Sequence, residues 1–314
     1  MSKRIFLFPG QGTQYIGMGK DFYDNFKESR EIFNKVSDIL KIRMDQLCFS
    51  ETKEKLNAIK NTQIAILTVS LAILEVLKKY NINAKWTAGL SLGEYTSLIY
   101  SGILDLNTGI ELVNKRGMIM QNNLPDMRFS MAAVITDNIG KIENICAKQQ
   151  KNGKNIFISN YNSSKQVVLS GEENSVNEVI NELKEVGIKK VIKLNTMGPF
   201  HTELMKKSKE KFKEELQKIK FNKSKMSVLK NIDATLYNED DNYVNILSNH
   251  LTNPVQFYNE IKVMKEQNIE EYIEIGPREV LTGFIKKEIP EAKTYSINSI
   301  EKLNEFLGEI KNGW

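Results

Sequence analysis

The sequence contains few of the residues that mark secreted, disordered or metal-dependent proteins. Its 314 residues include two cysteines, two histidines and six prolines. Two cysteines are too few for a disulfide framework, and Cys48 and Cys146 lack redox or metal-binding spacing, so both should be buried small hydrophobic side chains. For the same reason no zinc site is expected. Few prolines, together with 26% charged and 41% hydrophobic residues, exclude a long unstructured linker.

Long apolar runs are also missing. No stretch approaches the roughly 18 uncharged apolar residues that a membrane-spanning helix needs. Residues 1–4, MSKR, lead directly into a short apolar run and not into the core of a signal peptide. We therefore expect a cytoplasmic protein without a membrane partner.

The net charge of +5 is modest, but lysines gather in residues 206–225, KKSKEKFKEELQKIKFNKSK, which should form one strongly basic helix. An acidic partner is one explanation of this segment, and a solvated helix face with interleaved glutamates is the other. The chain has no aromatic RNA-binding motif and no zinc finger, so nucleic acid is not expected as a partner.

The pentapeptide Gly89-Leu90-Ser91-Leu92-Gly93 places a serine between two glycines, where an apolar strand at 84–88 should meet a helix at 94–100. The glycines allow a sharp turn that exposes the hydroxyl, and the helix N-terminus directs free N–H groups at the same place. This arrangement suits acyl-transfer chemistry, but an ordinary turn can have the same pattern. Other residues must decide between the two.

Alternating strands and helices predict an α/β core with a mostly parallel sheet. Residues 5–8 are an apolar run that ends in a Pro-Gly loop, as buried strands do, and residues 272–275, YIEI, repeat this pattern of a strand followed by a loop, before Gly276-Pro277. Apolar residues at helical spacing predict a helix over 62–80, and another helix should begin at about Val280.

The middle of the chain has a different order of elements. Residues 131–193 read as strand, helix, strand, strand, helix, strand, which is the split unit of a ferredoxin-like fold. We expect a small ferredoxin-like (βαββαβ) subdomain at 128–195, inserted into a large α/β-hydrolase-like domain made of 1–127 and 196–314. A cleft between the two is the natural place for a ligand.

A serine nucleophile needs a base, and His201 and His250 are the two histidines available. His201 ends the turn MGPFH, before a helix expected from Thr202, whereas His250 lies in a helix-end segment before Pro254. A lone histidine is more often structural than catalytic. The glycine-proline turn nevertheless favours His201 as the base.

Arg116 lies on a helix expected over 106–120, on one face with Gly109, Val113 and Met120. Its guanidinium should therefore point into the interior, where a permanent charge needs an anion. A structural salt bridge with an aspartate or glutamate is one way to supply it.

Four separated motifs resemble, in order and spacing, those of malonyl-CoA:acyl carrier protein transacylases, and the resemblance covers essentially the whole chain. The motifs are FPGQGTQ at 8–14, GLSLGEY at 89–95, GPFH at 198–201 and IGP at 275–277. The resemblance implies that Ser91 accepts the acyl group and that His201 is its general base. It also implies that a main-chain carbonyl at His250, and not an acidic third residue, orients His201.

Further roles follow from the same resemblance. The backbone N–H groups of Gln11 and Leu92 would form the oxyanion hole. Arg116 would bind the free carboxylate of the malonyl group, Phe200 would leave little room for an α-methyl group, and Asn160 would face the site. The chain departs from the common family pattern at four places: Thr13 for serine, Leu90 for histidine, Ser164 for proline and His250 for glutamine.

The implied activity is a ping-pong transfer of malonyl from malonyl-CoA to the phosphopantetheine thiol of acyl carrier protein for fatty acid synthesis, with no cofactor or metal. A monomer is expected. A discrete trans-acting acyltransferase of a polyketide synthase would share this chemistry. A carrier-protein thioester hydrolase is disfavoured by Arg116, and a non-catalytic carrier-binding module by the presence of both Ser91 and His201.

Overall fold

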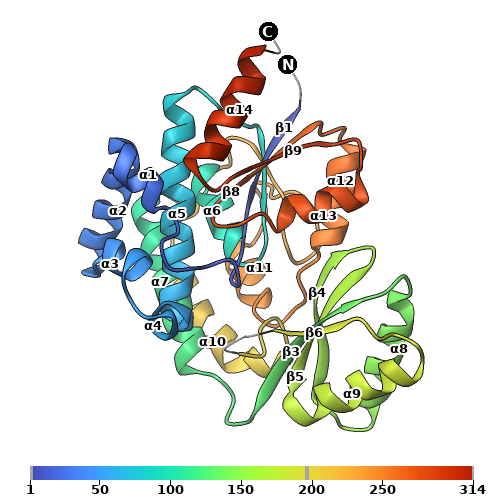
Figure 1. The fold of residues 1–314 in the computed structure, drawn as a ribbon. Coiled ribbons are helices and arrows are strands. Elements are labelled where there is room, and N and C mark those ends of the chain that lie inside the picture. The colour runs from blue at the N-terminus through green and yellow to red at the C-terminus, as the bar shows by residue number, and fades with distance from the viewer. Residues whose placement is uncertain (1–2, 195–197, 313–314) are drawn as a thin grey trace.

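The computed structural model describes residues 3–194 and 198–312, which fold around two β-sheets (Figure 1). The larger sheet consists of β1 (Arg4–Phe8), β2 (Trp86–Gly89), β7 (Ser227–Val228), β8 (Glu271–Ile275) and β9 (Lys293–Ile297). These strands are parallel and lie in the order β7-β2-β1-β8-β9. The predicted α/β core with a parallel sheet is confirmed.

Strand β1 contributes side chains to two hydrophobic cores, one on each face of the sheet. Phe6 packs in the core that contains α5 (Ile59–Lys79), whereas Leu7 packs in the core that contains α12 (Phe257–Glu266) and α13 (Leu281–Glu288). Because both faces are covered at β1, its residues 5–8 form a continuous apolar run, as is usual for strands of parallel sheets.

Most of the remaining helices lie with α5 on one side of the large sheet (Figure 1). They are α1 (Lys20–Asn25), α2 (Lys27–Leu40), α3 (Met44–Phe49), α4 (Lys53–Asn57), α6 (Leu92–Tyr100) and α7 (Leu106–Asn122). The second half of the chain adds the 3-10 turn η1 (Glu203–Met205), α10 (Lys206–Leu216), α11 (Tyr243–Asn249) and α14 (Ile300–Asn312).

Helix α5 is long and apolar enough to cross a membrane when judged by length and composition alone, although the sequence analysis expected no such segment. Packing accounts for this composition, because 83% of its apolar 18-residue window is buried inside the protein. The helix lies between α2 and α7 in the larger core.

The smaller sheet is antiparallel and is formed by the middle of the chain. It consists of β3 (Phe129–Ile135), β4 (Ile156–Ser163), β5 (Gln166–Glu172) and β6 (Val191–Leu194), in the order β4-β5-β3-β6. Helices α8 (Ile139–Lys151) and α9 (Glu173–Glu185) share its hydrophobic core. Backbone hydrogen bonds join β4 to Val255 of the large unit, from Tyr161 N–H to Val255 O and from Val255 N–H to Ser159 O, both at 2.9 Å.

The prediction of one basic helix over 206–225 is wrong. Helix α10 ends at Leu216, where its buried face of Ser208, Phe212 and Leu216 also ends. The following segment turns back and bonds to the end of α6 through the N–H of Lys225 and the carbonyl of Ser101. The helix expected from Thr202 also begins differently, with η1.

Glycines allow the large sheet and α6 to approach closely behind Ser91. A Cβ on Gly93 would lie 1.9 Å from Phe8 O, and a Cβ on Gly10 would lie 2.4 Å from Leu90 O. Larger residues are therefore excluded at both positions, and the loop after β1 is held against the turn after β2. This close packing brings the FPGQG and GLSLG motifs together.

We expect Gly93→Ala to destabilise the protein by about 3 kcal/mol or more, because the added methyl group meets a backbone oxygen that cannot move alone. Gly283→Ala is the matched control. Gly283 lies inside α13, and apart from its own helix backbone no atom lies within 4 Å of an added Cβ, so this substitution should be neutral or stabilise by up to about 1 kcal/mol. Urea unfolding of both variants measures the difference, and equal stabilities would contradict the close approach.

Candidate active site

Ser91 occupies a sharp turn between β2 and α6. Its backbone torsions are φ 56° and ψ −98°, a region that costs a non-glycine residue about 1–3 kcal/mol. Leu90 N–H still donates to Phe8 O at 3.0 Å, so the sheet continues up to the residue before the turn. The strained turn then lifts the hydroxyl away from the sheet and places it at the N-terminus of α6.

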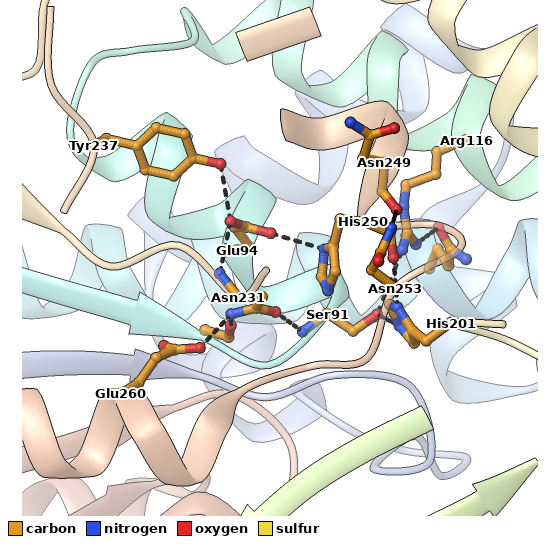
Figure 2. Close-up of polar contacts among 12 residues, drawn as sticks. Ser91, Glu94, Arg116, His201, Asn231, Tyr237, Asn249, His250, Asn253 and Glu260 are labelled. Carbon is orange, nitrogen blue, oxygen red and sulfur yellow. Dashed lines mark hydrogen bonds and ion pairs between the residues drawn. The ribbon is translucent and has the colours of Figure 1, made fainter. Parts of the chain in front are cut away.

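The structure brings the two residues of the predicted nucleophile and base together (Figure 2). Ser91 Oγ lies 2.7 Å from His201 Nε2, although 110 residues separate them in sequence. On the other side of the ring, His201 Nδ1 lies 2.8 Å from the carbonyl oxygen of His250. A carbonyl accepts only, so Nδ1 carries the proton and Nε2 accepts the hydrogen bond from the serine hydroxyl.

The environment of His201 favours its neutral form. The residue is 5% exposed, and burial lowers its pKa well below the ordinary value of 6.5. The neighbouring His250 and Arg116 lower this pKa further. A neutral imidazole is the form that can accept the Ser91 proton, so the base is kept ready to act under mildly acidic as well as neutral conditions.

Arg116 points inward from α7 and is 1% exposed. Its Nη1 donates to Gln63 Oε1 at 2.7 Å, its Nη2 lies 3.4 Å from Ser91 Oγ, and its Nε has no hydrogen-bond partner. Within the described residues no carboxylate pairs with it, and the ring of Tyr95 lies 5.1 Å from its guanidinium carbon. The salt bridge considered in the sequence analysis is therefore not found, and this charge lacks an anion.

Behind Ser91 lies a buried polar cluster that sequence analysis missed, formed by Asn231, Glu94 and Glu260 (Figure 2). Asn231 Oδ1 accepts from Ser91 N–H, and its Nδ2 donates to Gly89 O and to Glu260 Oε1. Burial, and next the charge of Glu94, raise the pKa of Glu260 well above 4.5. The one sequence signal was the presence of single carboxylates on the apolar faces of α6 and α12.

Glu94 also connects this cluster to His250. Its Oε1 accepts from the Asn231 N–H and the Tyr237 hydroxyl, while its Oε2 lies 3.0 Å from His250 Nδ1, within ion-pair distance. The rings of His250 and His201 lie 4.6 Å apart. The histidine at position 250 therefore places a second imidazole beside the base.

The structure places four other predicted residues as follows. Leu92 begins α6, so its N–H is in the first turn, where a helix supplies no acceptor. Gln11 follows Gly10, which packs on Leu90. Phe200 is buried against Gly198, and Asn160 is 7% exposed beside Val255.

Cys48 and Cys146 are free and buried, as predicted. Burial raises the pKa of Cys146 to about 12 and also raises that of Cys48, so neither thiol is a ready nucleophile or metal ligand. Among the residues that the structure describes, no three or more His, Cys, Asp or Glu side chains are grouped closely enough to hold a metal ion.

We expect the imidazole of His201 to titrate well below pH 6.5, and His250→Gln to raise its pKa toward that value, because the substitution removes a neighbouring ring and keeps the main-chain carbonyl. Proton NMR measures both values. With two histidines in the chain, His250→Gln leaves a single imidazole signal to follow, and His201→Gln provides the assignment control. An unchanged titration would mean that burial and Arg116 lower the pKa without a contribution from His250.

Comparisons with known proteins agree with this geometry. The family model described as "Acyl transferase domain" matches residues 5–304. The malonyl CoA-acyl carrier protein transacylase of Bacillus subtilis is 35% identical over 99% of this chain and 98% of its own length. The crystal structure of a transacylase of the same name from Clostridium perfringens has a TM-score of 0.94 and 38% identity, over 99% of this chain and 98% of that one.

A third related protein was solved with a partner. It is a malonyl-transacylase in complex with its type II PKS acyl-carrier protein, with a TM-score of 0.92 and 31% identity over 96% of this chain and 98% of that one. These matches span nearly the full length of both partners in each comparison. The chain therefore belongs to the malonyl-CoA:acyl carrier protein transacylase family.

Proposed function

We propose that this protein transfers malonyl from malonyl-CoA to the phosphopantetheine thiol of acyl carrier protein, through a malonyl ester on Ser91, and so supplies extender units for fatty acid synthesis. One observation carries the proposal: Ser91 Oγ lies 2.7 Å from His201 Nε2 and 3.4 Å from Nη2 of Arg116, a buried cation without an anion. A nucleophile, a base and a site for a carboxylate therefore meet at one hydroxyl.

In the first step Ser91 Oγ attacks the thioester carbonyl carbon, and His201 Nε2 takes the hydroxyl proton. The tetrahedral intermediate collapses when its C–S bond breaks, and the imidazolium returns the proton to the CoA thiolate. In the second step the same imidazole deprotonates the carrier-protein thiol. The sulfur attacks the carbonyl carbon of the serine ester, the bond from that carbon to Ser91 Oγ breaks, and the imidazolium returns its proton to Oγ.

His250 contributes through its main chain. Its carbonyl accepts from His201 Nδ1, which fixes the tautomer before reaction and stabilises the imidazolium during it. An acidic third residue is not needed for this role. The backbone N–H groups of Gln11 and Leu92 bind the oxyanion, and each such donor typically contributes about 3 kcal/mol to the transition state.

Arg116 selects the acyl group. A planar guanidinium can bind both oxygens of the malonyl carboxylate, which would supply the anion that this buried charge lacks. Phe200, next to the base, disfavours an α-methyl group at the same place. Acetyl groups have no carboxylate and gain nothing from Arg116.

The finer architecture and setting belong to the same proposal. The strand order β4-β5-β3-β6 supports a ferredoxin-like subdomain at 128–195 between two parts, 1–127 and 196–314, of an α/β-hydrolase-like domain. Asn160, tied through its neighbours to Val255, would line the cleft between them. We propose a cytoplasmic monomer that needs no cofactor, with acyl carrier protein and malonyl-CoA as its partners and with no nucleic acid or membrane partner.

Basic residues offer a docking surface for the acidic carrier protein. Exposed lysines on α10 and in the segment after it would attract such a partner through long-range electrostatics. One lysine of this segment, Lys218, is already paired with Glu215, which also pairs with Lys115 of α7. We expect the contribution of the segment to appear mainly in the association rate.

A second candidate function is a discrete acyltransferase that serves a polyketide synthase. The related malonyl-transacylase solved with a type II PKS acyl-carrier protein favours this alternative. Both functions use the same residues at Ser91, so they differ in the carrier protein that is loaded.

Ser91→Ala should abolish covalent labelling by malonyl-CoA, since no hydroxyl remains to form the ester. Intact-mass spectrometry after mixing with malonyl-CoA measures the added malonyl group, and Ser97→Ala, in the helix that follows Ser91, is the control that keeps the label. Full labelling of Ser91→Ala would refute the nucleophile assignment. Acetyl-CoA and methylmalonyl-CoA in the same assay identify the preferred acyl group.

Arg116→Ala should reduce kcat/KM for malonyl transfer by about 100-fold or more, which corresponds to about 3 kcal/mol of lost charge-assisted bonding, and should reduce acetyl transfer far less. Arg116→Lys keeps the charge but lacks the planar guanidinium, so its kcat/KM for malonyl transfer should lie between those of the wild type and Arg116→Ala. Parallel kinetics with malonyl-CoA and acetyl-CoA make the comparison. An equal loss for both donors would assign Arg116 a structural role.

A further inference from the structure

We propose that Asn231 is a positioning residue whose carboxamide clamps the two ends of the serine turn, so that Ser91 keeps the backbone conformation that aims its hydroxyl at His201. This inference rests on the proposed role of Ser91 as the nucleophile. It adds a residue from a distant loop, after β7, that touches neither the hydroxyl nor the base.

The contacts of Asn231 span the turn. Its Oδ1 accepts from Ser91 N–H at 2.5 Å, and its Nδ2 donates to Gly89 O at 2.6 Å. Nδ2 also donates to Glu260 Oε1 at 2.8 Å. Because one end of the amide faces an N–H and the other faces two oxygens, the positions of its O and N atoms are fixed by its partners.

A clamp is needed because the N–H of Ser91 has no backbone acceptor, although its carbonyl accepts from Glu94 N–H at 3.2 Å. Strand β2 ends at Gly89, α6 begins at Leu92, and the N–H of Ser91 is beyond the sheet ladder and before the helix. Its torsions, φ 56° and ψ −98°, are unfavourable for a residue with a side chain. The Asn231 side chain supplies the missing acceptor for the Ser91 N–H. Its Nδ2 also bonds to the carbonyl of Gly89, the last residue of β2.

Asn231 is itself held from behind. It is 0% exposed, its N–H donates to Glu94 Oε1 at 3.1 Å, and its carbonyl accepts from Gln256 N–H at 2.8 Å. Glu94 also lies within ion-pair distance of His250, whose carbonyl orients the base. The turn of Ser91 is therefore anchored on one buried cluster, Glu94, Asn231 and Glu260, and the Glu94 carboxylate of this cluster lies beside the ring of His250 (Figure 2).

Loss of the Asn231 clamp should lower the acylation rate as well as the stability, because the residue that it holds, Ser91, is the nucleophile. In Asn231→Ala the turn can relax, and Ser91 Oγ moves away from His201 Nε2, while Arg116 and its approach to a bound carboxylate are unchanged. The acylation rate at saturating malonyl-CoA should then fall by about 100-fold, whereas the half-saturating concentration should change by less than about threefold. A purely structural residue would leave both unchanged in the folded protein.

Thr87→Val is the matched control. It removes a buried hydrogen bond, Thr87 Oγ1 to Ser97 Oγ at 2.9 Å, between the same strand and helix without touching Ser91. Stability is measured by urea unfolding, and acylation by rapid-quench intact-mass spectrometry. A rate in Asn231→Ala that matches Thr87→Val once both are folded would overturn the proposal.

Two further measurements separate this inference from the proposed function. A fluorophosphonate, which labels activated serines whatever their acyl donor, should react with the wild type and about 100-fold more slowly with Asn231→Ala. If the wild type reacts with the fluorophosphonate but not with malonyl-CoA, the proposed function is wrong. The comparison of fluorophosphonate rates between the wild type and Asn231→Ala then still tests the clamp. If the variant does not fold, hydrogen exchange in the wild type decides: a Ser91 N–H that exchanges as fast as an open loop amide would overturn the clamp, and strong protection would support it.

Discussion

The hydrogen bond from His201 Nδ1 to the carbonyl of His250 determines which nitrogen of the ring is free to act. It leaves Nε2 as an acceptor for the Ser91 hydroxyl, and burial keeps the imidazole neutral. A main-chain carbonyl is a modest orienting group compared with a carboxylate, but it cannot lose its function by protonation. The position of this carbonyl, however, depends on the contacts that hold the end of α11, and the contact between His250 and Glu94 is one of them.

Much of the site could be predicted because its residues leave local signals. Glycines flank Ser91, a Gly-Pro turn precedes His201, and Arg116 lies on the buried face of an amphipathic helix. Each signal reflects a constraint within a few residues of chain: a tight turn, a fixed loop or a helical period. The same reasoning predicts the parallel sheet, since buried strands are short apolar runs between helices.

The remainder depends on contacts that no local pattern records. Asn231 meets Ser91 across 140 residues, and its own segment has the composition of an ordinary polar loop. The sequence also did not predict the end of α10. Lysine and glutamate favour helix well beyond Leu216, and the helix ends where its buried apolar face ends. For Arg116 the sequence correctly predicts that the side chain is buried. It does not show that no carboxylate of the described residues pairs with the guanidinium.

The burial of Cys48 and Cys146 has a practical consequence for studying how a carrier protein docks. Both thiols are inaccessible and poorly ionised, so the surface that the structure describes carries no native site for maleimide dyes or spin labels. A single cysteine introduced on α10 or near β6 would be the sole labelled position. Distances to a tagged partner could then be mapped on the unmodified core of the enzyme.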